Sequence, residues 1–262
     1  RELYFVNEGL KVPKYGQAEL VEVETSFTAY QEFQSMLTRD RIDIFMVGEF
    51  DDYQVLQALH RFPLEGRQVD LQFSYSQPYV NVVKEKIEPR QSSQSILQLG
   101  YQFPCQYGDK DYFALIVFNA MFGEFAHSAL FTTLREKEGL AYSISSQFDI
   151  FTGLLEVYAG IEKSNRNQAM RGISRELNYI KLGRFSSSLL NQTKKIIRMN
   201  ALLSEDHALT LVEQRFNKVI FGDKSLSLEN WLDEIEKVTK KDVCRVARQV
   251  KLQSLFFLEG VS

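Results

Sequence analysis

The chain of 262 residues has little of what marks secreted, membrane or nucleic-acid-binding proteins. Its two cysteines, Cys105 and Cys244, lie far apart with no CxxC spacing, which argues against a disulfide scaffold and favours a reducing, cytoplasmic compartment. Lys and Arg number 31 against 34 Asp and Glu, and this net charge of −3 gives little attraction for nucleic acid or anionic lipid. The longest apolar run, residues 113–122, contains Asn119 and is about half of a bilayer span. We therefore expect no nucleic-acid partner and no membrane segment.

Motifs for metal, nucleotide and nucleophile chemistry are also missing. The chain has three histidines, His60, His127 and His207, and no two of them have the spacing of an HExxH or HxxEH zinc helix. No GxSxG, GxxxxGKS/T or GxGxxG segment occurs. We therefore expect this chain to hold no metal or cofactor by itself, with His60 and His207 near the surface and the cysteines in the core.

What the chain does have is the composition of a folded globular protein. Hydrophobic residues make up 44% and charged residues 25%, and the length suits one large or two modest domains. The chain begins with Arg1, and its first residues resemble neither a signal peptide nor the start of a domain. We expect a further segment to precede them in the natural protein.

The first part of the chain predicts a helix, a strand, a second helix and a linker. Phe27, Tyr30 and Phe33 repeat at helical spacing behind the capping residue Thr25, which predicts a helix over residues 25–39. The apolar run 42–48 ends in glycine and predicts a buried strand. Residues 56–62 predict a second helix, and the aperiodic stretch 65–78 predicts a linker.

The rest of the chain predicts strands and helices in an order typical of an α+β domain with helices on one face of a sheet. Thr152 and Gly153 separate two alternating runs and predict a hairpin. The expected strands are residues 80–87, 95–103, 140–148, 154–161 and 252–258, and the expected helices are residues 109–122, 128–138 and most of the stretch from 165 onward.

Both ends of the chain carry a helix followed by an apolar strand that ends in glycine, one closing at Gly48 and the other at Gly260. This similarity predicts that residues 1–68 are the tail of a preceding homologous half plus a linker, and that residues 69–262 form the main domain. Because helix–strand units are common, a chance similarity stays open as the alternative.

The most specific pattern is the segment 122–144, FGEFAHSALFTTLREKEGLAYSI. The pattern FGxxxxSxLFxxLREKxGLAYSI resembles the signature of the C-terminal halves of M16 zinc peptidases, the group of pitrilysin, insulinase and the mitochondrial processing peptidase. The strand SILQLGY, the hairpin at Gly153 and the segment VTKKDV follow in the family's order, so the resemblance covers about residues 75–260. It implies an M16-like fold, with a ferredoxin-like sheet and helices packed on one face.

The same resemblance implies a function. In that family two homologous halves enclose an extended peptide or unfolded polypeptide, and only the first half binds zinc, through HxxEH. The second half supplies an Arg and a Tyr that bind the peptide backbone, and these match Arg135 and Tyr142 here. The resemblance thus implies no catalytic and no metal-binding residue in this chain, and zinc in a missing N-terminal half or in a paralogous M16 partner subunit.

The chemistry of the two side chains suits this role. A guanidinium offers planar donors and a phenol offers one hydroxyl, and the turn at Gly139 can aim both at one concave face. Such donors stabilise charge on a peptide carbonyl by about 3 kcal/mol each in a dry site. The plainer interpretation is that REKE is a solvated helix end and Tyr142 an ordinary strand aromatic.

Two other functions stay open. Glu124, Phe125 and His127 replace a stretch that is richer in glycine in the family, which favours a non-catalytic member: an inactive scaffold or partner subunit in a protein complex. A ferredoxin-like module for a small ligand rests on fold analogy alone.

Overall fold

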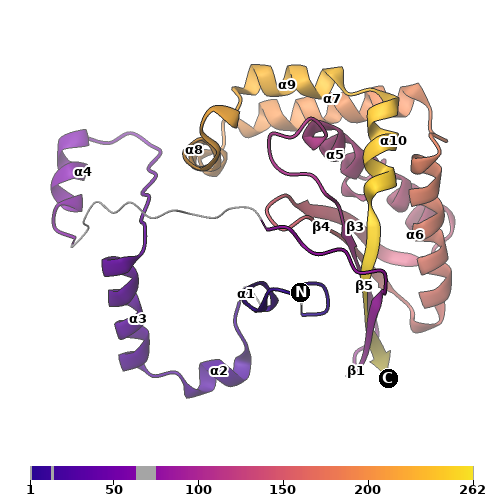
Figure 1. The fold of residues 1–262 in the computed structure, drawn as a ribbon, viewed down its shortest axis with the longest axis horizontal. Coiled ribbons are helices and arrows are strands. Elements are labelled where there is room, and N and C mark those ends of the chain that lie inside the picture. The colour runs from indigo at the N-terminus through magenta and orange to yellow at the C-terminus, as the bar shows by residue number, and fades with distance from the viewer. Residues whose placement is uncertain (1, 13–14, 63–74, 262) are drawn as a thin grey trace.

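The computed structural model describes residues 2–12, 15–62 and 75–261, and its centre is a five-stranded sheet (Figure 1). The strands are β1 (Lys84–Gln91), β2 (Ser95–Gln102), β3 (Ala141–Asp149), β4 (Leu154–Ile161) and β5 (Lys251–Val261). Their order is β1-β5-β2-β4-β3, so the last strand of the chain lies between the first two. β5 pairs in parallel with β1, and the other pairs are antiparallel.

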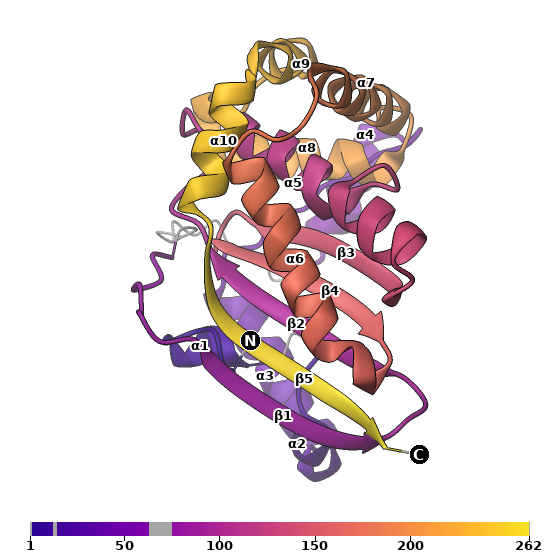
Figure 2. The same cartoon turned by 90° about the vertical axis from the view of Figure 1, so that its right-hand side faces the viewer.

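Helices cover one face of this sheet (Figure 2). The helical segments are α5 (Tyr112–Asn119), the π-helices η1 (Ala120–Glu124) and η2 (Phe131–Lys137), α6 (Arg166–Lys181), α7 (Ser187–Ser204), α8 (Ala208–Phe221), α9 (Leu228–Lys237) and α10 (Lys240–Gln249). Short 3-10 turns, η3 (Lys163–Asn165) and η4 (Gly222–Lys224), precede α6 and follow α8. The predicted α+β fold with one helical layer is therefore confirmed.

The core lies between the sheet and this layer. In β2, Leu97, Leu99 and Tyr101 occupy every second position and are at most 3% exposed, so they face the helices. Phe118 and Leu115 of α5 are fully buried in the same cluster. Each such side chain stabilises the fold by about 2 kcal/mol, and together they fix η1 and η2 against β3.

The N-terminal helices bury little of their surface. They are α1 (Glu8–Lys11), α2 (Ala18–Val23), α3 (Ser26–Arg39) and α4 (Asp52–Leu59), and none of them contains a buried residue. Figure 1 shows α3 and α4 standing away from the sheet. α3 begins as predicted behind Thr25, which forms a capping box with Thr28. Its apolar side chains Phe27, Tyr30 and Phe33 remain 49–66% exposed.

The strand predicted over residues 42–48 is wrong. This segment is irregular in the structure, and Ile42, Ile44 and Met46 are 36–48% exposed. It lies against α8 instead, where the Phe45 and Phe216 rings meet edge to face at 6.2 Å. A strand needs a neighbouring strand to take its backbone hydrogen bonds, and none of the five strands in the described part of the chain pairs with this run.

Other predictions differ from the structure mainly in their bounds. The strand expected over residues 80–87 begins four residues later, because pairing with β5 defines it and leaves Val82 and Val83 exposed. The predicted helices 109–122 and 128–138 appear as α5 with η1 and as η2. The hairpin, the last strand and the helix near residue 56 are confirmed. Of the predicted linker 65–78, residues 65–74 lie outside the described residues.

Candidate functional site

Arg135 lies near the end of η2 and is exposed to solvent. Its guanidinium stands over the Phe131 ring at 4.6 Å from the ring centre. A cation over an aromatic face is held by an attraction of about 0.5–1 kcal/mol at an exposed site. The stacking orients the side chain while leaving its N–H donors available, and no ion pair involves Arg135 in the described part of the chain.

The turn after η2 follows the predicted pattern. Gly139 has a φ of +62°, a left-handed conformation that favours glycine. The backbone N–H of Glu138 donates to the Thr133 carbonyl at 2.9 Å, and that of Leu140 donates to the Leu134 carbonyl at 2.8 Å. These bonds satisfy carbonyls at the helix end, and β3 begins two residues after the glycine.

Tyr142 occupies an irregular position at the start of β3. Ala141 pairs with Ile161 and Ser143 pairs with Gly160, so Tyr142 is an extra residue in the ladder, as in a β-bulge. Regular alternation with buried Ile144 would turn Tyr142 toward the helices. Because of the bulge, Tyr142 is 58% exposed. The sequence offered no sign of this register shift.

The Tyr142 hydroxyl donates a hydrogen bond to Oε1 of Glu162 at 2.8 Å. This bond, together with the negative charge of Glu162, raises the pKa of Tyr142. Sequence reasoning did not single out Glu162, which follows β4 directly and therefore reaches Tyr142 across the β3–β4 pair. The bond holds the phenol in place and uses its only donor.

Arg135 and Tyr142 are close in sequence, but no hydrogen bond or cation–π contact joins them in the structure as described. A hollow of about 390 Å³ adjoins the turn, and Glu138, Leu140 and Arg171 line it. Neither Arg135 nor Tyr142 is among its lining residues. The arrangement thus presents two exposed polar side chains beside a turn, and the role assigned to them stays a prediction.

Metal ligands do not gather anywhere in the described residues: no three His, Cys, Asp or Glu side chains are placed to share an ion. His60 caps the end of α4, His207 stands before α8, and His127 bonds to Thr193. Cys105 and Cys244 are free and buried, as expected of core residues. The zinc implied by the resemblance therefore has no fitting donor set in this part of the chain.

One polar cluster lies beneath η1 and includes Glu124, from the start of the segment 122–144. Ser146 of β3 donates to Oδ1 of Asn119 at 2.7 Å, and Nδ2 of Asn119 donates to Glu124 at 2.9 Å. Partial burial raises the pKa of Glu124, while the Asn119 bond opposes this shift. Gly123 allows the close approach, since a Cβ there would lie 2.8 Å from the Ser146 backbone nitrogen. The cluster joins η1 to β3 and is structural.

The model of the family described as "Peptidase M16 inactive domain" matches residues 30–197, so the chain belongs to the M16 peptidase family through that domain. Among described helices, none combines the length and apolar character that crossing a bilayer requires.

Particular relatives are similar over nearly the whole chain. The "Probable inactive metalloprotease YmfF" of Bacillus subtilis is 35% identical over 246 residues, 94% of this chain and 58% of the relative. The "Uncharacterized zinc protease YmxG" of the same organism is 24% identical and matches 93% of this chain and 59% of its own length. A crystal structure of a conserved protein from Enterococcus faecalis V583 is 37% identical with a TM-score of 0.90, over 97% of this chain and 60% of that one. This chain thus spans about three fifths of the length of these relatives.

Proposed function

We propose that this chain is the peptide-binding half, without metal, of an M16-type metallopeptidase, and that Arg135 and Tyr142 bind the backbone of an extended peptide. The observation that carries the proposal is the bulge in β3, which turns Tyr142 to solvent two residues after the turn that follows η2. Bulges recur next to sites because they re-aim a side chain. Arg135 lies on the other side of the same turn, near the end of η2, and its guanidinium is oriented by Phe131.

The proposal includes a partner. Zinc and the hydrolytic chemistry belong to an N-terminal M16 half or to a paralogous M16 subunit, because metal ligands do not cluster among the residues described here. Relatives named zinc proteases are longer than this chain, which is consistent with such a half. When bound there, zinc would supply an activated water and polarise the peptide carbonyl, and the donors of this chain would orient the peptide.

We also propose that residues 1–68 end a homologous half and that residues 69–262 form the domain proper. The exposed apolar face of α3 and the unpaired run 42–48 support this division, since both have the patterns of covered elements. The free cysteines support a cytoplasmic location.

The test uses the complete protein with its zinc-bearing half or subunit and a fluorogenic peptide. We expect Arg135→Gln to lower kcat/KM about 100-fold, the size of losing one oriented donor. Tyr142→Phe should also lower it, because it removes the hydroxyl that Glu162 holds in place and whose oxygen can still accept a hydrogen bond from a peptide N–H. Lys137→Gln, two residues from Arg135 and also exposed, is the matched control and should leave turnover unchanged. Equal turnover in all three variants would remove the assigned roles.

A second function, an inactive scaffold subunit, has specific support. The family description contains the word "inactive", and the Tyr142 hydroxyl already donates to Glu162. If the complete protein neither binds zinc nor changes the peptidase activity of an M16 partner, the scaffold is the correct assignment.

A further inference from the structure

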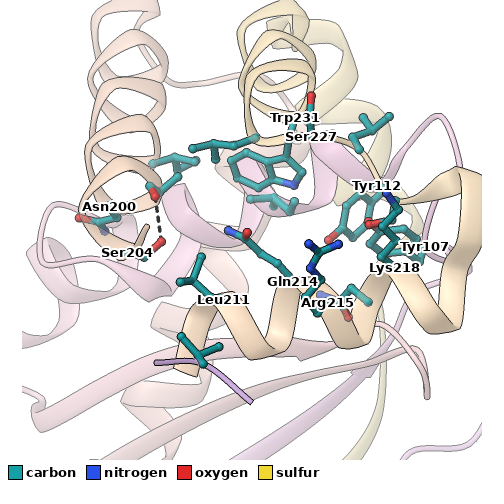
Figure 3. A pocket seen from close by; sticks show the side chains of 18 of the residues that line it. Tyr107, Tyr112, Asn200, Ser204, Leu211, Gln214, Arg215, Lys218, Ser227 and Trp231 are labelled. Atoms are coloured by element: carbon teal, nitrogen blue, oxygen red, sulfur yellow. Dashed lines mark hydrogen bonds between the residues drawn. The ribbon is translucent and has the colours of Figure 1, made fainter. Parts of the chain in front are cut away.

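A cavity of about 1070 Å³ lies at one end of the helical layer (Figure 3). α5, η1, α7, α8 and α9 surround it, and the segment 46–50 closes one side. Neither Arg135 nor Tyr142 lines this cavity. Its volume is in the range of sites that hold small organic ligands.

The floor of the cavity is apolar. Ile116, Phe125, Phe148 and Trp231 line it, and each is a half-buried side chain packed on the main core. The Trp231 ring meets Phe113 edge to face at 6.0 Å, which fixes its position. Apolar surface that is already half withdrawn from water binds a hydrocarbon body with little reorganisation.

The rim of the cavity is cationic on the side formed by α8. Figure 3 shows Gln214 and Arg215 projecting from α8 toward Trp231, and Lys218 lies one turn further along. No salt bridge engages Arg215 or Lys218 in the described structure. Glu124 is the one acidic residue among the lining residues described, and Asn119 already donates to its carboxylate.

We propose that this cavity binds an amphipathic monoanion, with an aliphatic or aromatic body on the Trp231 floor and a carboxylate at Arg215 and Lys218. An anion pairs with the cations of Arg215 and Lys218, while the apolar floor favours a hydrocarbon body over a hydrated inorganic ion. The site is separate from the turn that carries Arg135 and Tyr142, so it does not depend on the proposed peptidase role.

The experiment titrates three ligands of equal chain length into the 262-residue chain: decanoate, 1-decanol and decyltrimethylammonium. Trp231 is the only tryptophan in the sequence, so its fluorescence reports on the cavity, and calorimetry provides a second readout. We expect saturable binding of decanoate, about fivefold or more tighter than decanol, with decyltrimethylammonium weakest.

Variants test each part of the site. Arg215→Gln and Lys218→Gln should each weaken decanoate binding about fivefold and leave decanol binding unchanged. Ala201→Phe, which fills the cavity from α7, should abolish binding of both. Lys195→Gln, on α7 outside the cavity, is the control, and circular dichroism verifies folding of every variant.

Three outcomes would overturn the proposal: no saturable signal by either readout, binding of the cationic ligand as tight as that of decanoate, or equal losses in Lys195→Gln and Arg215→Gln. Failure here would leave the peptide-binding proposal intact, because that proposal is tested by turnover with variants at Arg135 and Tyr142.

Discussion

His127 has a definite tautomer that the surrounding hydrogen bonds determine. Its Nε2 lies 2.9 Å from Oγ1 of Thr193, and that hydroxyl donates to the Leu189 carbonyl at 2.9 Å. Since a hydroxyl carries one proton, Thr193 must accept from His127, so Nε2 carries the hydrogen. Partial burial of the ring lowers the pKa of His127.

The lowered pKa of His127 makes the free energy of unfolding depend on pH. The unfolded chain binds a proton at His127 more readily than the folded chain does, so its contribution to stability is complete above the ordinary pKa of 6.5 and is lost as the pH falls below that value. His127→Gln keeps a donor for Thr193 but cannot titrate. We expect the free energy of unfolding to fall less between pH 7.5 and pH 5.5 in this variant, measured by urea denaturation.

The exposed His207 provides the control for that experiment. His207→Gln is the matched substitution of a histidine outside the core. Identical slopes for His127→Gln and the unmodified chain would show that burial of the imidazole does not contribute to the pH dependence.

At the scale of elements, one ion pair joins the start of α5 to α10. Nε and Nη2 of Arg245 donate to Oδ1 of Asp111 at 3.0 and 2.7 Å, and Gln249 donates to Oδ2 at 3.3 Å. Asp111 is 8% exposed, so its carboxylate depends on these donors for compensation. The pair connects residues far apart in the sequence, and no local pattern indicated it.

We expect Asp111→Ala to lower the free energy of unfolding by about 2–3 kcal/mol, because charge-assisted hydrogen bonds in a buried setting are lost. Chemical denaturation monitored by circular dichroism measures the change. Glu234→Ala removes the exposed ion pair with Lys237, which is 2.6 Å long, and should lower the free energy of unfolding much less than Asp111→Ala does, because solvent screens the pair. If both variants lowered the free energy of unfolding equally, burial would not be what makes the Asp111 pair the stronger one.

Segment 42–48 and β5 have similar local sequences, but only β5 forms a strand. Both are short apolar runs that follow a helix, and both contain a glycine near the end. β5 forms a strand because β1 and β2 flank it and take its backbone hydrogen bonds. The run 42–48 has the same local pattern without those neighbours in the described structure, so pattern alone cannot distinguish the two.

At the scale of the whole molecule, a short N-terminal segment packs on the sheet, although α1–α4 contain no buried residue. Phe5 is fully buried, and the Tyr4 hydroxyl donates to the Gly153 carbonyl at 3.0 Å. Gln77 donates to the Tyr4 carbonyl at 2.5 Å. Residues that begin the chain thus complete the packing around the β3–β4 hairpin.

We expect Phe5→Ala to lower the free energy of unfolding by about 3 kcal/mol, the usual cost of removing a buried phenylalanine. Phe33→Ala on α3, where the ring is 49% exposed, should change it by less than about 0.5 kcal/mol. Denaturation of both variants by guanidinium tests the difference. A negligible effect of Phe5→Ala would mean that the segment contributes nothing to the stability of the sheet.

The sequence by itself determined the elements whose causes are local. Thr25 caps α3, Gly139 follows the end of η2, and Gly153 lies in the hairpin turn. The alternating apolar residues of β2 define its buried face. The segment LREKEGLAYSI by itself carries the resemblance to the M16 family. These features depend on residues within a few positions of one another, so local patterns are sufficient.

Only the tertiary structure decided the rest, because it depends on contacts between distant residues. The bulge at Tyr142 arises from the register between β3 and β4, and the hydrogen bond from Tyr142 to Glu162 crosses that strand pair. Segment 42–48 stays irregular because none of the five described strands pairs with it. The cavity beside Trp231 is likewise lined by five helical segments and the 46–50 segment. These segments are far apart in sequence, so no local pattern predicts that they meet.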